Sequence, residues 1–224
     1  NSHNIPVIED GAQSFGATMN GKKSCAMTEL STTSFFPTKP LGGYGDGGAI
    51  FTNEDEWASR CRQIRVHGQK SKHHHDLIGL NGRLDTLQAA ILLEKLAIFP
   101  DEIALRQTIA KRYDEAFAPL HEKSLITLPT VPQSATSVYA QYTILRDNRD
   151  PLVDGLKEKG VPSVPYYAVP LHLQKCFEDL GYAAGDLPIT EDVANRSLSL
   201  PMNPYLSVED QDFIISSFQE LVDS

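Results

Sequence analysis

The sequence predicts a chain of mixed α and β structure in two parts. Short apolar runs at residues 5–8, 32–36 and 48–52 have the length and composition of buried strands. Apolar residues from Leu84 to Leu96 recur at helical spacing. After residue 118 the chain becomes rich in proline and polar residues, which is typical of a connector. We therefore expect one domain over residues 1–118 and a smaller one over residues 119–224.

Turns, caps and loops separate the elements of the first part. The Asn20-Gly21 pair is a strong signal for a hairpin turn. Asn53 is a suitable N-cap for a helix over residues 54–66. Residues 67–82 hold three consecutive histidines and several glycines, so we expect a loop there.

Two helices are expected to close the first part. The helix that begins near Leu84 should end at Phe99-Pro100, because proline cannot donate a helical hydrogen bond, and a second helix should cover residues 101–118. In the second part Gly160 has the position of a C′ glycine. The elements expected there are a strand over 138–145, a helix over 150–159, an extended segment over 161–173, and helices over 190–196 and 208–221.

Composition limits the classes of function. The chain has 224 residues, of which 41% are hydrophobic, and a net charge of −9, so no general affinity for nucleic acid or anionic lipid is expected. Cys25, Cys61 and Cys176 show neither a disulfide framework nor a zinc pattern, which favours a reducing cytoplasm. No apolar run reaches the roughly 20 residues of a membrane helix. Because an apolar run begins already at residue 5, we expect that part of the first domain precedes this sequence.

Three side chains of the first part suggest cofactor chemistry. Asp10 ends one strand, Ser34 lies near the end of another, and Lys39 follows in a loop rich in glycine. Pyridoxal phosphate (PLP) enzymes need a lysine amine, a carboxylate for the pyridinium nitrogen, and hydroxyl groups for the phosphate. From pattern alone, a turn aspartate and an exposed loop lysine explain the same residues.

Four motifs point further. Residues 7–16 (VIEDGAQSFG), 33–48 (TSFFPTKPLGGYGDGG), 81–92 (NGRLDTLQAAIL) and 166–174 (YYAVPLHLQ) resemble, in this order, the DegT/DnrJ/StrS family of sugar aminotransferases. The resemblance covers nearly the whole chain. It implies the aspartate-aminotransferase-like fold of fold-type I PLP enzymes, with a mostly parallel sheet in a large α/β domain, here without its N-terminal portion. A smaller C-terminal α+β domain and an active site at a homodimer interface are also implied.

The resemblance assigns roles to five residues that bind the cofactor. Lys39 would bind PLP as a Schiff base and act as the catalytic residue. Asp10 would pair with the pyridinium nitrogen, and Gln13 would lie near the phenolic oxygen of the ring. Ser34 would bind the phosphate, and Asn81 would reach the phosphate of the neighbouring protomer.

The substrate is also suggested by the resemblance. The motif around Lys39, including Pro40, is similar to that of the WbpE-like enzymes, which transfer an amino group from glutamate to a UDP-linked 3-keto hexuronic acid for surface polysaccharide or lipopolysaccharide synthesis. Arg83 would suit the substrate carboxylate because its guanidinium group binds two oxygens at once. His172 is a second candidate for substrate contact, and Tyr44 would either line the site or pack against it.

Other interpretations remain open at this point. The chain is alternatively a non-catalytic remnant that keeps dimerisation or sugar-binding surfaces. A PLP-dependent sugar dehydratase of the same family would carry histidine in place of Lys39. We expect no metal site, since His73, His74 and His75 read as a solvated loop. Asp85 and Gln88 are most simply helix-start and surface residues.

Overall fold

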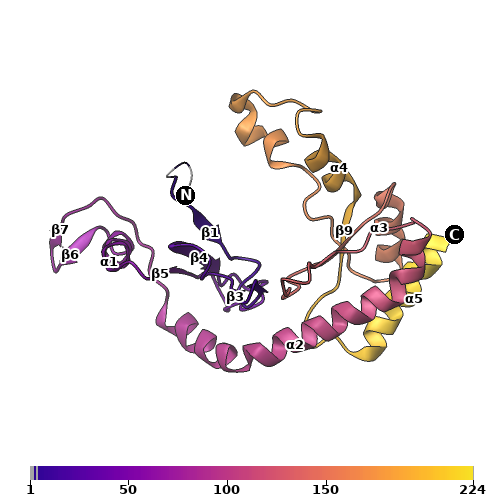
Figure 1. Cartoon of the computed structure of the whole chain (residues 1–224), viewed down its shortest axis with the longest axis horizontal. Coiled ribbons are helices and arrows are strands. Elements are labelled where there is room, and N and C mark those ends of the chain that lie inside the picture. Colours follow the sequence, from indigo (N-terminus) through magenta and orange to yellow (C-terminus); the bar gives the residue numbers. More distant parts are fainter. Residues whose placement is uncertain (1–2, 4, 224) are drawn as a thin grey trace. The chain divides into compact units, whose positions relative to one another are not determined.

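The computed structural model describes residues 3 and 5–223, in two compact units (Figure 1). One unit comprises Asn1–Ala104 with Val131–Ala140, and the other comprises Leu105–Thr130 with Gln141–Ser224. The chain passes between them within one helix, α2 (Thr86–Glu122). The domain boundary expected near residue 118 lies inside this helix.

A three-stranded sheet forms the centre of the first unit. Strand β4 (Leu30–Ser34) lies between β1 (Ile8–Asp10), with which it pairs in parallel, and β5 (Gly48–Thr52), with which it pairs antiparallel (Figure 1). The strand over 48–52 is confirmed at its predicted bounds. The prediction that residues 5–8 form a buried strand is wrong, because β1 begins at Ile8 and the side chain of Ile8 is exposed.

The first unit also contains two small hairpins, which are separate from this sheet. The predicted Asn20-Gly21 turn joins β2 (Thr18–Met19) to β3 (Lys22–Lys23), and both turn residues have positive φ, as a type I′ turn requires. The prediction of loop throughout residues 67–82 is wrong, since β6 (Gln69–Ser71) and β7 (His74–His75) pair there. Their polar, two- or three-residue strands carry no apolar alternation that a sequence pattern could reveal.

Helix α1 (Asp55–Ile64) follows β5. Its N-cap is Glu54, so the prediction of Asn53 at this position is wrong. The N–H of Glu54 donates to Thr52 Oγ1 at 3.1 Å, and this local turn moves the start of the helix one residue along the chain.

Helix α2 is continuous, so the predicted break at Pro100 is wrong. Proline in a helix interior costs about 3 kcal/mol. The neighbouring Phe99 is 4% exposed and packs in the core of the first unit with Leu41 and Leu92. Burial of Phe99 before Pro100 and partial burial of Ile103 after it offset the missing hydrogen bond.

The second unit packs helices on a two-stranded antiparallel sheet. Strands β8 (Tyr142–Leu145) and β9 (Ser197–Leu200) pair along their whole length, and helices α3 (Arg149–Glu158), α4 (Pro188–Arg196) and α5 (Val208–Asp223) belong to this unit. The 3-10 helix η1 (Leu171–Leu173) occupies the end of the extended segment expected over 161–173, and a second 3-10 helix, η2 (Lys175–Leu180), follows it. In the core the ring of Tyr113 stacks on Phe117, while Tyr142 meets Tyr113 and Phe218 meets Phe117 at a tilt.

The end of helix α3 is as predicted. Gly160 follows the C-cap of α3 with φ +78°, and its N–H donates to Lys157 O, which confirms the predicted C′ glycine.

Within the described part of the chain, no helix combines the length and the apolar character needed to cross a bilayer.

Candidate active site

The carboxyl ends of β1 and β4 meet at one edge of the sheet, because these two strands are parallel. Asp10 is the last residue of β1 and lies opposite Thr32 in β4, so Ser34 follows two residues further along the same edge. The N–H of Ala12 donates to Asp10 Oδ1 at 2.9 Å, which orients the carboxylate at the end of the strand. The predicted carboxylate and hydroxyl are therefore brought to one edge of the sheet.

Lys39 lies in a tight turn that directly follows β4. Its N–H donates to Phe36 O at 2.9 Å, and the N–H of Phe36 donates to Ser34 Oγ at 3.2 Å. The side chain of Lys39 is half-buried. Two consecutive local hydrogen bonds thus link the Lys39 turn to the end of the strand that carries Ser34.

The glycine segment after Lys39 folds back onto β4. The N–H of Gly43 donates to Phe35 O at 2.8 Å, and the N–H of Phe35 donates to Gly47 O at 2.8 Å. A Cβ atom on Gly42 would lie 2.5 Å from Pro37 O, so only glycine fits at this position without a shift of the backbone. Glycine is therefore required at position 42 because the two halves of the motif approach each other closely there.

Leu41 anchors this loop in the core of the first unit. It is 3% exposed and belongs to a cluster with Leu92 and Phe99 of α2. Partly buried Phe15, Phe35, Leu84 and Ile103 pack against the cluster. Lys39 thus lies two residues before a buried anchor.

Gln13 lies in the turn that follows β1. Its side chain is exposed, and the neighbouring Phe15 stacks on Phe99 with ring centroids 5.9 Å apart. The N–H groups of Ser14 and Phe15 both donate to Gly11 O. The turn that carries Gln13 is therefore held on the same helix as the Lys39 loop.

Asn81 and Arg83 lie on the segment before α2. Val66 and Asn81 form an antiparallel bridge, and the N–H of Gly82 donates to Arg65 O at 2.8 Å. These contacts tie the backbone to the end of α1, while the side chains of Asn81 and Arg83 are exposed. Both side chains are therefore presented to solvent in the described chain.

His172 belongs to the second unit. Its side chain is 6% exposed, its Nε2 lies 3.1 Å from Glu191 Oε1, and its ring meets Tyr182 edge-on. Glu191 also accepts N–H bonds from Gly185 and Leu187, and the Gly185 bond is the main reason why the pKa of Glu191 is lowered. The imidazole thus lies in a local polar cluster.

Three residues that the sequence interpretation left without a role hold the site together. Gln88 is half-buried and bonds the loop at Tyr44, so its interpretation as a surface residue is wrong. Lys95 Nζ donates to Gly42 O at 2.6 Å. Glu9 accepts the N–H of Cys25 at 2.7 Å beside Asp10. Their only signal in the sequence is a polar residue inside an apolar run or helix.

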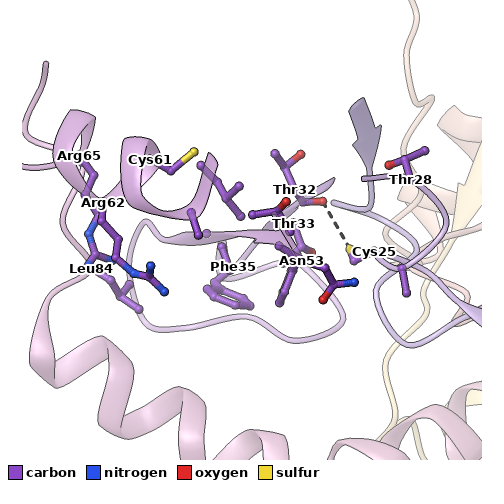
Figure 2. Close-up of a pocket in the computed structure, with 18 residues that line it drawn as sticks. Cys25, Thr28, Thr32, Thr33, Phe35, Asn53, Cys61, Arg62, Arg65 and Leu84 are labelled. Atoms are coloured by element: carbon purple, nitrogen blue, oxygen red, sulfur yellow. Dashed lines mark hydrogen bonds between the residues drawn. The ribbon is translucent and has the colours of Figure 1, made fainter. Parts of the chain in front are cut away.

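A pocket of about 930 Å³ lies elsewhere in the first unit (Figure 2). Residues of β4, β5 and α1 line it, among them Thr32, Phe35, Cys61 and Arg62. The Sγ of Cys25 donates to Thr32 O at 3.5 Å at its rim, and burial is the main cause that raises the pKa of this thiol. Asp10, Ser34 and Lys39 do not line this pocket, so it is separate from the candidate cofactor site.

The three neighbouring histidines are exposed. His75 Nδ1 lies 2.9 Å from His67 O, so one ring is engaged with the backbone of the preceding segment. Among the residues that the structure describes, no group of three histidine, cysteine, aspartate or glutamate side chains is placed to hold a metal ion.

Known proteins resemble this chain closely in sequence. UDP-2-acetamido-2-deoxy-3-oxo-D-glucuronate aminotransferase of Pseudomonas aeruginosa is 51% identical over 204 residues, which are 91% of this chain and 55% of that protein. This chain therefore spans little more than half of the length of that relative.

Solved structures agree. A DegT/DnrJ/EryC1/StrS aminotransferase from Brucella abortus is 44% identical and matches all of this chain and 59% of its own with a TM-score of 0.91. DesV of S. venezuelae, solved in complex with a ketimine intermediate, is 32% identical and matches all of this chain and 59% of its own with a TM-score of 0.94. The expected aspartate-aminotransferase-like fold is confirmed. A model of the DegT/DnrJ/EryC1/StrS aminotransferase family matches residues 1–219, and the chain belongs to this family.

Proposed function

We propose that this chain acts in a PLP-dependent aminotransferase that transfers an amino group from glutamate to a UDP-linked 3-keto-sugar. The observation that carries the proposal is the placement of Asp10, Ser34 and the Lys39 turn at one edge of the sheet. The chain belongs to an aminotransferase family, and its Pseudomonas aeruginosa relative is named for a UDP-linked 3-oxo-glucuronate. These two findings support the same reaction.

The residues present fit PLP by their chemistry. Asp10 and Ser34 lie at one edge of the sheet, and the turn that carries Lys39 directly follows β4. A carboxylate, a hydroxyl group and an amine are the groups that hold the ring nitrogen, the phosphate and the aldehyde carbon of this cofactor. When bound, PLP supplies an electron sink for the carbon from which a proton is removed. Asp10 would keep the ring nitrogen protonated, and its orientation by the N–H of Ala12 suits that role.

Lys39 would perform two tasks. Its amine would bind the cofactor covalently, and once displaced by the amino donor it would remove the proton from the α-carbon of the donor and deliver it to the aldehyde carbon (C4′) of the cofactor. Ser34 would donate a hydrogen bond to the phosphate, and Gln13 would lie beside the phenolic oxygen. Asn81 would serve the phosphate of a second protomer, which requires a homodimer.

Three residues are proposed for substrate selection. Arg83 is exposed and would bind the carboxylate of a hexuronic acid through two parallel hydrogen bonds. Tyr44, with 76% of its surface exposed, would line the sugar site. His172 is largely buried against Glu191. We therefore propose that it affects substrate binding indirectly, by holding the segment 166–174 in place.

The setting follows from composition. Three free cysteines favour the cytoplasm, where nucleotide sugars for surface polysaccharide or lipopolysaccharide would be made. Glutamate and the UDP-sugar are the proposed small-molecule partners, with neither nucleic acid nor membrane as a partner.

The test is an assay of the purified chain with PLP, glutamate and a UDP-linked 3-keto hexuronic acid. We expect 2-oxoglutarate and the UDP-amino sugar to appear in equal amounts, detected by mass spectrometry. Lys39→Arg should abolish both products, while Lys23→Arg, on the exposed hairpin, should leave them unchanged. Binding of the UDP-sugar by a folded chain without either product would favour the non-catalytic alternative.

A further inference from the structure

We infer that Gln88 and Lys95 of α2 are positioning residues that fix the glycine segment 42–45 and thereby set the location of the Lys39 amine. The inference rests on the proposed function, because it assigns to two helix residues the task of placing the lysine that binds the cofactor.

The Gln88 carboxamide lies directly against the loop. Its Oε1 accepts the N–H of Tyr44 at 2.7 Å. A Cβ atom on Gly43 would lie 2.9 Å from this oxygen, and a Cβ atom on Gly45 would lie 3.2 Å from Nε2. One side chain therefore contacts three consecutive loop residues, and the flanking glycines allow this close approach.

Lys95 holds the same loop two helical turns further along. Its Nζ donates to Gly42 O at 2.6 Å and lies 5.8 Å from the centre of the Tyr44 ring. Residues seven apart share one face of a helix. Leu92 lies between Gln88 and Lys95 on that face and packs against Leu41. An amide, an apolar side chain and an ammonium group thus meet three successive parts of the loop.

The geometry of the loop links the position of the glycine segment to the position of Lys39. Gly42 and Gly43 follow Lys39 within four residues, and the N–H of Gly43 donates to Phe35 O, directly after β4. Gly42 is in close approach to Pro37 O, on the other side of Lys39. A shift of the glycine segment would therefore displace the backbone on both sides of the lysine.

This arrangement has a kinetic consequence. Misplacement of a catalytic group by about 1 Å can cost on the order of 100-fold in rate, even when the fold is intact. We expect Gln88→Met, which keeps the length of the side chain and removes the acceptor, to slow attachment of PLP to Lys39 by on the order of 10-fold or more. Lys95→Met should slow it in the same direction.

The experiment compares four variants of the full chain with the unaltered chain. Gln88→Met and Lys95→Met remove the contacts, Gln88→Glu keeps an acceptor for the N–H of Tyr44, and Glu94→Gln alters an exposed neighbour on α2 as a control. The first readout is the rate at which the visible absorbance band of lysine-bound PLP appears. The second, which needs no cofactor, is hydrogen exchange at the Tyr44 amide.

The expected result is slow attachment and faster Tyr44 exchange in Gln88→Met and Lys95→Met, with Gln88→Glu restored toward the unaltered chain and Glu94→Gln unchanged. Unaltered attachment rates in both methionine variants, together with unaltered Tyr44 exchange, would overturn the inference. If the unaltered chain itself takes up no PLP, the proposed function fails, and Tyr44 exchange still decides whether the two side chains hold the loop. If Gln88→Met does not fold, the comparison of Lys95→Met with Gln88→Glu replaces it: the inference still requires slow attachment and faster Tyr44 exchange in Lys95→Met only.

Discussion

The Lys39 loop and the segment around His172 are both irregular, yet they are held in opposite ways. Contacts from residues 44 and 53 positions away in sequence fix the Lys39 loop, and a buried leucine anchors it in the core. His172 itself is held by one carboxylate, Glu191, whose partners lie 4 to 19 positions away, and Ser197 Oγ donates to Tyr166 O at the start of the segment. Apart from His172, most of its side chains are exposed.

The difference concerns what each region depends on. The loop that carries the proposed catalytic lysine depends on apolar burial, on the Gln88 amide and on the Lys95 ammonium group, and none of these contacts involves a carboxylate. The contacts of His172 depend on one carboxylate, Glu191. We therefore expect the first region to stay rigid in acid and the second to loosen locally there, as is common for segments that admit ligands.

The largest expected effect is on the anchor of the Lys39 loop. Leu41→Ala should lower the free energy of unfolding by about 3 kcal/mol, because it removes a buried side chain and leaves a cavity. Leu171→Ala in the other region should change it by less than about 0.5 kcal/mol, since Leu171 is 73% exposed. Equal losses in urea denaturation would contradict the distinction between the regions.

A second, more local effect concerns Glu191. Glu191→Ala should remove the acceptor of the Gly185 and Leu187 N–H groups and so increase hydrogen exchange at both amides. Exchange at Tyr44 in the Lys39 loop should not change. Retained protection at Gly185 would mean that the carboxylate does not organise this segment.

The smallest expected effect is a dependence on pH. The pKa of Glu191 is lowered from its ordinary 4.5, chiefly by the N–H of Gly185, with His172 and the N–H of Leu187 adding to the shift. Because the folded segment binds this proton more weakly than the unfolded chain does, the stabilisation is complete above pH 4.5 and is lost as the pH falls through the lowered pKa.

Hydrogen exchange corrected for its intrinsic pH dependence measures this loss. Protection at Gly185 should fall in acid below pH 4.5, and Glu191→Gln should remove that dependence. Protection at Tyr44 should be insensitive over the same range. A parallel fall at Tyr44 would show that the two regions do not differ in this respect.

The sequence predicts best the features that depend on neighbouring residues. The turn at Asn20-Gly21 and the glycine after α3 need only a positive φ, which glycine and asparagine adopt at low cost. The strand Gly48–Thr52 is marked by its composition and by its glycine-rich flank. The family motifs around Asp10 and Lys39 belong to this group, because each lies at the end of a strand.

Features that depend on distant residues escaped prediction. Pro100 carries a local cost that predicts a break, and only the burial of Phe99 in a core formed by far segments makes the helix continuous. Strand β9 is short and follows α4 directly, so no turn marks its start. The sequence around Gln88 predicts an ordinary surface residue, because the Tyr44 N–H that it accepts lies 44 positions earlier in the chain.

Covalent trapping of the cofactor tests the central proposal most directly. The purified chain is incubated with PLP, reduced with borohydride, digested, and mapped by peptide mass spectrometry. The account predicts a phosphopyridoxyl group on the peptide that contains Lys39, at near one equivalent, and its loss in Lys39→Arg. A folded chain that carries the group on other lysines only, or on none, would contradict it.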